Sequence, residues 1–320
     1  MSRGSRAIPV AELVERARAG EARAVARLIS LVEDRSPSLR EVSAALTPHT
    51  GSAHIVGITG SPGVGKSTST SALVTALRAQ GKRVGVLAVD PTSPFSGGAL
   101  LGDRVRMQDH ATDDGVYIRS MASRGHLGGL SASAPQALRV LDAAGCDVVL
   151  VETVGVGQSE VEIAGLADTT LVLLAPGMGD GIQAAKAGIL EIGDIFVINK
   201  ADREGAQSTR RELRSVLAMT ERDDHAWKPP IVLTVATRGE GVDEVAEQVA
   251  AHRLHLGESG ELERRRLARL RREIEALALT EVQSRFAGLS GDARLDALAE
   301  QVLAGETDPF AAADTLVEHV

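Results

Sequence analysis

The chain has 320 residues, about two domains' worth of length, and its 43 Asp and Glu residues outnumber its 35 Lys and Arg residues, giving a formal net charge of −8. This acidic balance argues against a protein that binds nucleic-acid phosphates, and an aromatic content of 2% nearly excludes a stacking platform for single-stranded bases. With 43% hydrophobic residues, the chain is predicted to be globular, with a core of Val, Leu, Ile and Ala.

Cysteine and histidine usage limits the metal chemistry. Cys146 is the single cysteine, which excludes intrachain disulfides and cysteine-rich zinc or iron–sulfur sites. His252 and His255 could bind a metal, but their spacing on a predicted helix favours a solvated face. The most apolar runs, 147–152 and 170–176, are strand-length, and the N-terminus lacks a signal-peptide core. We therefore expect a soluble, cytoplasmic protein.

The chain begins with helices and continues as alternating strands and helices. Residues 8–19 are predicted to form a helix that ends at Gly20, and Ser36 is predicted to cap a helix that starts at Pro37. Predicted strands cover 54–59, 83–89, 116–120, 148–152, 169–175, 195–199 and 231–235. Predicted helices between them cover 66–80, 135–144, 160–166, 183–191 and 209–218. The apolar strands lack polar alternation, so we predict an α/β fold with a mostly parallel sheet covered by helices on both faces.

The C-terminal part is predicted to be helical. A helix over 242–256 is followed by a break at 257–260 and by a long charged helix from Glu261. Apolar residues of that helix are spaced three, four and three apart, like a short coiled-coil seam, at Leu267, Leu270, Ile274 and Leu277. This pattern predicts a helical arm that pairs with a partner helix, as in a homodimer. We expect an N-terminal helical segment (1–50), a nucleotide-binding domain (51–256) and this arm (257–320).

Residues 60–67 match the phosphate-binding motif G-x-x-x-x-G-K-[ST], between a predicted strand and a predicted helix. Glycines let successive backbone N–H groups turn toward phosphate oxygens, and the helix N-terminus adds its positive end. Lys66 places a cation between the terminal phosphates, and the Ser67 hydroxyl suits Mg²⁺. The predicted nucleotide-binding residues of this loop are Gly60, Ser61, Gly63, Val64, Gly65, Lys66, Ser67 and Thr68.

A second motif, N-K-x-D, indicates the base. Asn199, Lys200 and Asp202 follow the predicted strand that precedes them, and the Asp202 carboxylate can accept both the ring N–H and the exocyclic amine of guanine. Adenine presents a lone pair at that ring nitrogen, so the pocket would reject it. Residues Val235, Ala236 and Thr237 are expected to close the pocket through backbone N–H groups. The predicted base is guanine.

A third group of acids follows predicted strands. Glu152 and Gly155 form E-x-x-G where many GTPases have D-x-x-G, so Glu152 is predicted to support Mg²⁺ directly or through water. Gln158 stands three residues after Gly155, and either a catalytic or an ordinary loop role fits it. Asp90 ends a strand, which suits a metal ligand and a turn residue equally well. On pattern alone, Asp103 is a surface helix acid.

Five segments carry a family resemblance: GITGSPGVGKST, VLAVDPTSPFSGGALLGDRVRM, VETVGVGQSE, APGMGDGIQAAKAGILEIGD and VINKAD. They resemble the methylmalonyl-CoA mutase-associated GTPases, the MeaB/ArgK family, from about residue 10 to beyond residue 280. The resemblance implies a P-loop GTPase that binds GTP, GDP and Mg²⁺ and dimerises through C-terminal helices. It also implies a chaperone of an adenosylcobalamin-dependent mutase, which gates cofactor loading and protects the mutase. Methylmalonyl-CoA and isobutyryl-CoA mutases would both be compatible partners.

The resemblance also implies residue roles. Ser67, Asp90, Asp103 and Glu152 match the Mg²⁺-associated positions of the family. Arg106 falls in the region of switch I, and residues 177–188 resemble an additional switch that signals to the mutase, with Asp180, Gln183 and Lys186 as polar members. The predicted catalytic residues are Lys66, Glu152, Arg106 and Lys186. We expect slow GTP hydrolysis in the absence of the partner.

Two alternatives belong to other functional classes. A metal-delivery GTPase would need clustered Cys and His ligands, which a single cysteine disfavours. A small-molecule kinase would transfer the γ-phosphate to an acceptor other than water, and Asp202 disfavours ATP as its donor.

Overall fold

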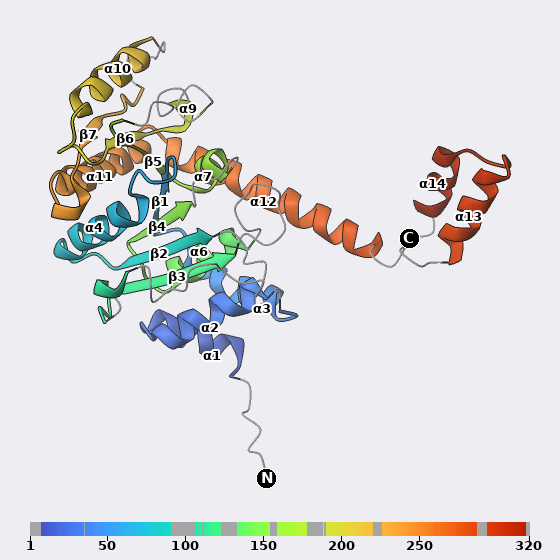
Figure 1. Cartoon of the computed structure of the whole chain (residues 1–320). Helices are drawn as coiled ribbons and strands as arrows, with labels where there is room; N and C mark the ends of the chain where they lie inside the picture. Colours follow the sequence, from blue (N-terminus) through green and yellow to red (C-terminus); the bar gives the residue numbers. More distant parts are fainter. Residues whose placement is uncertain are drawn as a thin grey trace. The chain divides into compact units, whose positions relative to one another are not determined.

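The computed structural model describes residues 8–34, 36–90, 107–110, 112–122, 133–153, 159–177, 188, 190–219, 226–286 and 293–317. The chain forms two compact units, the first ending at Arg265 and the second running from Arg266 to Val320. The first unit contains the sheet, whose elements are labelled in Figure 1.

Within the described residues, seven parallel strands form one sheet in the order β3-β2-β4-β1-β5-β6-β7. The strands are β1 (His54–Thr59), β2 (Val84–Asp90), β3 (Val116–Ala122), β4 (Val148–Thr153), β5 (Thr169–Leu174), β6 (Ile195–Ile198) and β7 (Ile231–Leu233). All seven predicted strands are confirmed, with ends that differ by at most two residues. Because β1 lies between β4 and β5, the loop after β1 leaves the carboxyl edge of the sheet near its middle.

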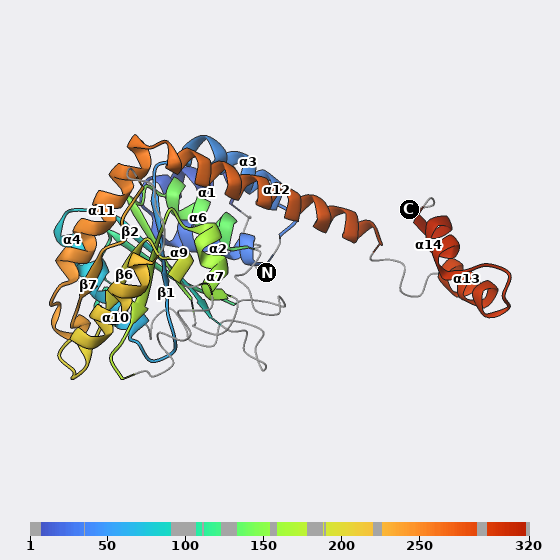
Figure 2. The ribbon, with the colours of Figure 1, turned by 90° about the horizontal axis from the view of Figure 1, so that it is seen from above.

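Helices cover both faces of the sheet, as Figure 2 shows from above. One face packs against α4 (Lys66–Ala79) and α11 (Val242–Glu258). The other face packs against α2 (Ala22–Glu33), α6 (Ala134–Ala143), α7 (Ser159–Leu166) and α10 (Ala206–Ala218), while α1 (Val10–Arg18) and α3 (Leu39–Leu46) pack on α2 and α6. The N-terminal helices therefore share one core with α6 and the sheet.

Two details of the predicted helices differ from the structure. Ser38, not Ser36, directly precedes α3, because the Ser36 hydroxyl accepts a hydrogen bond from the Ser38 N–H at 3.3 Å inside a turn. Helix α11 continues to Glu258, past the expected break at 257, and the turn to the next helix falls at Gly260, with φ of 68°. The predicted helix 183–191 lies largely outside the described residues, of which α9 (Leu190–Ile192) is helical.

Helix α12 (Glu261–Phe286) begins in the first unit and continues into the second, which also contains α13 (Ala293–Leu303) and α14 (Pro309–Val317). The predicted seam on α12 is largely exposed within this chain, from 43% at Leu270 to 65% at Ile274. No helix in the described part of the chain combines the length and apolar character that crossing a membrane requires.

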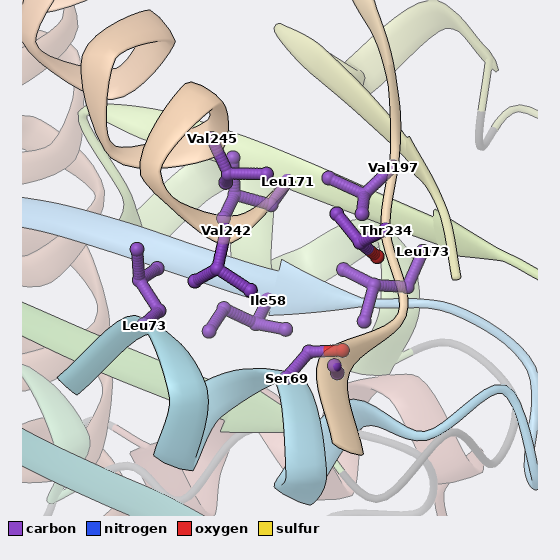
Figure 3. A pocket seen from close by; sticks show the side chains of 10 residues that line it. Ile58, Ser69, Leu73, Leu171, Leu173, Val197, Thr234, Val242 and Val245 are labelled. Atoms are coloured by element: carbon purple, nitrogen blue, oxygen red, sulfur yellow. The ribbon is translucent and has the colours of Figure 1, made fainter. Parts of the chain in front are cut away.

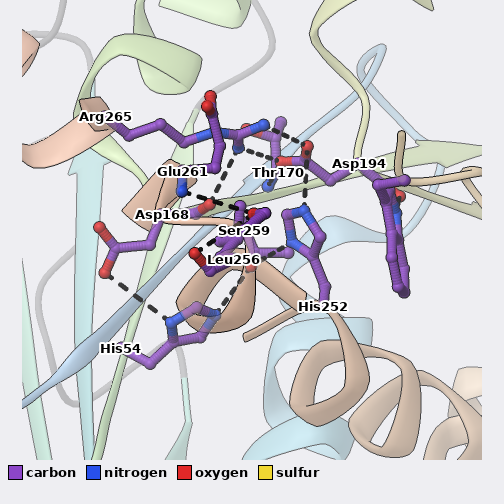
Figure 4. Close-up of polar contacts among 11 residues, drawn as sticks. His54, Asp168, Thr170, Asp194, His252, Leu256, Ser259, Glu261 and Arg265 are labelled. Carbon is purple, nitrogen blue, oxygen red and sulfur yellow. Dashed lines mark hydrogen bonds and ion pairs between the residues drawn. The ribbon is translucent and has the colours of Figure 1, made fainter. Parts of the chain in front are cut away.

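A buried polar network occupies the amino edge of the sheet (Figure 4). The Thr169 hydroxyl lies 2.8 Å from both His54 Nε2 and His252 Nδ1, and all three side chains are buried. Asp194 lies 3.5 Å from His252 Nε2 and accepts two hydrogen bonds from the Arg265 guanidinium, each 3.0 Å long. The network therefore fastens the first turn of α12 to the sheet.

The expectation of a solvated helix face at His252 is wrong. The side chain is fully buried, and the Trp227 ring packs against it at a centroid distance of 4.8 Å. Burial lowers the pKa of His252 to about 4; the Asp194 carboxylate opposes this shift, and Arg265 adds to it. The spacing of the two histidines matched a helix correctly, but it could not show that the face carrying His252 meets the sheet edge.

His252 is expected to make stability pH-dependent. Its folded pKa of about 4 lies below the ordinary 6.5, so the unfolded chain binds the proton more tightly. The contribution of His252 to the free energy of unfolding is complete above pH 6.5. As the pH falls toward 4, about 3 kcal/mol of this contribution is lost. Urea unfolding between pH 7 and pH 4.5 should show a smaller decline for His252→Gln than for the native chain. Equal declines in the two proteins would contradict the assignment.

Candidate nucleotide-binding site

The loop between β1 and α4 folds as a phosphate-binding loop. Gly60 has φ of 139°, and a Cβ atom there would overlap the Leu173 carbonyl oxygen of the neighbouring strand β5. Gly63 and Gly65 also have positive φ, at 81° and 97°, and Gly65 caps the N-terminus of α4. The glycines therefore supply conformations and a close approach that other residues would not tolerate.

The Lys66 side chain is held within this loop. Its Nζ donates hydrogen bonds to the Gly60 carbonyl at 2.5 Å and to the Ser61 carbonyl at 3.2 Å, and the residue is buried. The ammonium group thus lies at the N-terminal end of α4, where the helix dipole also favours an anion.

Ser67 and Glu152 meet at the carboxyl edge of the sheet. The Ser67 hydroxyl donates to Glu152 Oε1 at 2.5 Å, although 85 positions separate the two residues in the chain. Glu152 lies near the carboxyl end of β4 and pairs in register with Ala88 of β2. Strand β2 ends at Asp90, so the Asp90 backbone lies at the same edge of the sheet. Two oxygen donors of the predicted magnesium set are therefore in contact.

Asn199 connects the phosphate-binding loop to the turn after β7. Its Nδ2 donates to the Val64 carbonyl at 2.8 Å, while its Oδ1 accepts from the Thr234 hydroxyl at 3.2 Å and from the Ala236 N–H at 3.1 Å. Lys200, with φ of 59°, donates from Nζ to the Gly63 carbonyl at 2.6 Å. The N-K-x-D motif and the P-loop therefore form one assembly.

The turn after β7 differs from expectation in its backbone hydrogen bonds. The Ala236 N–H donates to Asn199, and the Val235 N–H donates to the Glu240 carbonyl at 3.0 Å. The expectation that these two N–H groups face the base is therefore wrong in this structure, because a buried amide oxygen and a short bridge use them first. Thr237 lies between Ala236 and Arg238 in the turn η4 (Ala236–Arg238).

Sequence motifs did not indicate two further residues of this region. Thr234 is buried against Asn199, and Arg238 places Nη2 3.8 Å from the Asp202 carboxylate. The sequence does offer a signal for Arg238. It is a basic residue just after the predicted base-closing turn, and it can therefore pair with the acid of N-K-x-D. Thr234 offered none beyond its place at the end of an apolar strand.

Several predicted site residues lie outside the described residues: Asp103, Arg106, Gly155, Gln158, Asp180, Gln183 and Lys186. Asp90 is described only through its backbone. Thr68 is exposed on the first turn of α4.

A small cavity lies behind the site, between α4, α11 and the sheet (Figure 3). Ser69, Leu73, Thr234 and Val242 are among its lining residues, and its volume of about 20 Å³ suits about one water molecule. A nucleotide cannot enter it, so the candidate site is the outer side of the P-loop.

A parallel sheet with a phosphate-binding loop after a central strand defines a P-loop nucleoside triphosphatase. The family model described as "Methylmalonyl Co-A mutase-associated GTPase MeaB" matches residues 25–290, and the chain belongs to this family.

Known proteins extend the match over the whole chain. A protein of Pyrococcus horikoshii whose name contains the word GTPase is 50% identical over 98% of both chains. The GTPase ArgK of Escherichia coli is 39% identical over 79% of both chains. A crystal structure described as LAO/AO transport system kinase superposes with a TM-score of 0.71 at 30% identity, covering 98% of this chain and 99% of the other. The protein is therefore a GTPase that binds GTP and GDP and hydrolyses GTP.

The close approach at Gly60 predicts a stability effect. Gly60→Ala should reduce the free energy of unfolding by at least about 3 kcal/mol, because the new Cβ meets backbone that cannot rotate away. Gly63→Ala is the matched control: it also has positive φ but has open space around it, so about 1 kcal/mol is expected. Urea unfolding without nucleotide measures both, and equal losses would contradict the packing of Gly60 on β5.

Proposed function

We propose that this GTPase is a chaperone of an adenosylcobalamin-dependent acyl-CoA mutase of the methylmalonyl-CoA mutase type. The observation that carries the proposal is the family match, whose description names the mutase. A Caenorhabditis elegans relative named "Methylmalonic aciduria type A homolog, mitochondrial" supports it, with 37% identity over 82% of this chain and 67% of the relative. In this role the protein gates loading of the cobalamin cofactor and protects the mutase from inactivation.

The proposed nucleotide contacts follow from the assembly around the P-loop. Lys66 and the loop N–H groups bind the phosphates, and Asp202 reads guanine beside Asn199 and Lys200. Residues proposed to contact the nucleotide are Gly60, Ser61, Gly63, Val64, Gly65, Lys66, Ser67, Thr68, Gly155, Asn199, Lys200, Asp202 and Thr237.

Magnesium fits the acids at the carboxyl edge. The Ser67 hydroxyl and the Glu152 carboxylate, 2.5 Å apart, are hard oxygen donors of the kind that Mg²⁺ prefers. We propose that Ser67, Glu152, Asp90 and Asp103 hold the ion directly or through water. Bound Mg²⁺ would neutralise phosphate charge.

Hydrolysis is proposed to depend on the partner. Lys66 supplies one positive charge near the phosphates, and Arg106 and Lys186 are the proposed further cations. A mutase that orders the segments containing these two residues would raise the rate, since a cation helps only while it is correctly placed.

The protein is further proposed to act in the cytoplasm as a homodimer. The half-exposed seam of α12, at Leu267, Leu270, Ile274 and Leu277, supports pairing with a second copy. A monomeric mass by light scattering would contradict the dimer.

Two alternative functions, metal delivery and a small-molecule kinase, have less support. Cys146 is buried and its pKa is raised to about 12 by burial, so it is a poor ligand for metal delivery. A kinase function is favoured only by the word kinase in the description of the similar crystal structure. Transfer of a γ-phosphate label to an acceptor other than water would support that function.

Removing the P-loop lysine tests the phosphate site. Lys66→Ala should weaken GTP binding by about 100-fold or more, because the lost ammonium group served the phosphates. Isothermal calorimetry on folded protein measures the effect, with Lys82→Ala, an exposed lysine beyond the other end of α4, as the control. Native-like affinity in a folded Lys66→Ala protein would refute the assignment.

Adding the mutase tests the chaperone proposal. GTP turnover should rise at least about tenfold when a cobalamin-dependent methylmalonyl-CoA mutase is added, since a missing transition-state cation costs about 10³–10⁵ in rate. Lys186→Ala should lose most of this stimulation, and Lys228→Ala should retain it. An unchanged rate with the mutase present would contradict partner-dependent hydrolysis. Full stimulation of Lys186→Ala would show that another residue carries the effect.

A further inference from the structure

Arg238 joins two acids at the mouth of the proposed base pocket. Its Nε forms an ion pair with Glu240 Oε1 at 2.8 Å, and its Nη2 lies 3.8 Å from Asp202 Oδ2. The side chains remain accessible, with 53% of Arg238 and 43% of Asp202 exposed. The guanidinium therefore bridges the two carboxylates while the face toward solvent stays open to a ligand.

The two acids come from different parts of the fold. Asp202 follows β6, whereas Arg238 and Glu240 belong to the turn after β7, which Asn199 already ties to the P-loop through Ala236. The Val235 N–H bond to the Glu240 carbonyl closes this turn and fixes the backbone on either side of Arg238. Arg238 thus reaches from a fixed turn to the residue proposed to read the base.

Guanine recognition requires both oxygens of the Asp202 carboxylate. One oxygen must accept the ring N–H and the other the exocyclic amine, so the carboxylate plane must match the base plane. An exposed carboxylate turns freely about its last side-chain bond. The Arg238 contact at 3.8 Å is an ion pair and not a hydrogen bond, so the acceptor positions of Oδ2 remain open to guanine.

We propose that Arg238, held by Glu240, is a specificity-determining residue that orients the Asp202 carboxylate for two-point recognition of guanine. This inference rests on the proposed guanine-reading role of Asp202. Arg238 acts through Asp202 and is a positioning residue. The loss of Arg238 should therefore weaken the binding of a base with both N–H donors more than the binding of a base with one.

Guanine and hypoxanthine nucleotides separate this role from simple charge attraction. Hypoxanthine lacks the exocyclic amine, so IDP offers Asp202 one donor where GDP offers two. In Arg238→Ala, GDP affinity should fall about three- to fivefold and IDP affinity less than about 1.5-fold, a range set by the modest strength of an exposed ion pair. Calorimetry at fixed ionic strength measures both, with Arg203→Ala, an exposed arginine next to Asp202, as the control.

A double-mutant cycle completes the test. In an Asp202→Asn background, Arg238→Ala should change neither affinity by more than about 1.5-fold, because the carboxylate that it orients is gone. Equal losses for GDP and IDP in Arg238→Ala, or no loss for either, would overturn this inference alone. If Asp202→Asn itself leaves the preference for GDP over IDP unchanged, the proposed guanine pocket is wrong, and the role of Arg238 is overturned with it.

Discussion

The buried amide of Asn199 is the constraint on which the nucleotide site depends. Its nitrogen holds the Val64 carbonyl of the P-loop, and its oxygen holds Thr234 and the Ala236 N–H after β7. The amide also lies so close to Gly65 that a Cβ atom would overlap it. With only 3% of Asn199 exposed, water cannot replace these bonds, so the phosphate side and the base side are fixed relative to each other.

The sheet separates two polar regions with different tasks. At its carboxyl edge, Lys66, Ser67 and Glu152 lie around the P-loop, as expected for a ligand site in an open parallel sheet. At its amino edge, Thr169, His252 and Asp194 form a closed network that holds the first turn of α12. Strand β5 reaches both regions, with Thr169 at one end and the Leu173 carbonyl against Gly60 near the other.

Short-range patterns predicted most of the fold. Continuous apolar runs located all seven strands, because strands buried on both faces leave an unbroken signal, and the P-loop identified the turn after β1. Tertiary contacts could not be predicted in this way. The burial of His252, the contact of Ser67 with Glu152 and the bridge from Arg238 to Asp202 all join residues far apart in the chain. The sequence pattern predicts that the Ala236 N–H faces the base, because only the folded structure brings the competing acceptor, Asn199 Oδ1, next to it.

The central claim is that the P-loop and the N-K-x-D motif form one pocket that selects guanine. Displacement of a fluorescent GDP analogue from the native chain by unlabelled nucleotides tests it most directly. The account predicts that GDP and GTP displace the analogue at concentrations at least about 100-fold lower than ADP and ATP, because adenine would leave the Asp202 carboxylate without its two donors. Displacement by ATP at the same concentration as GTP would contradict it.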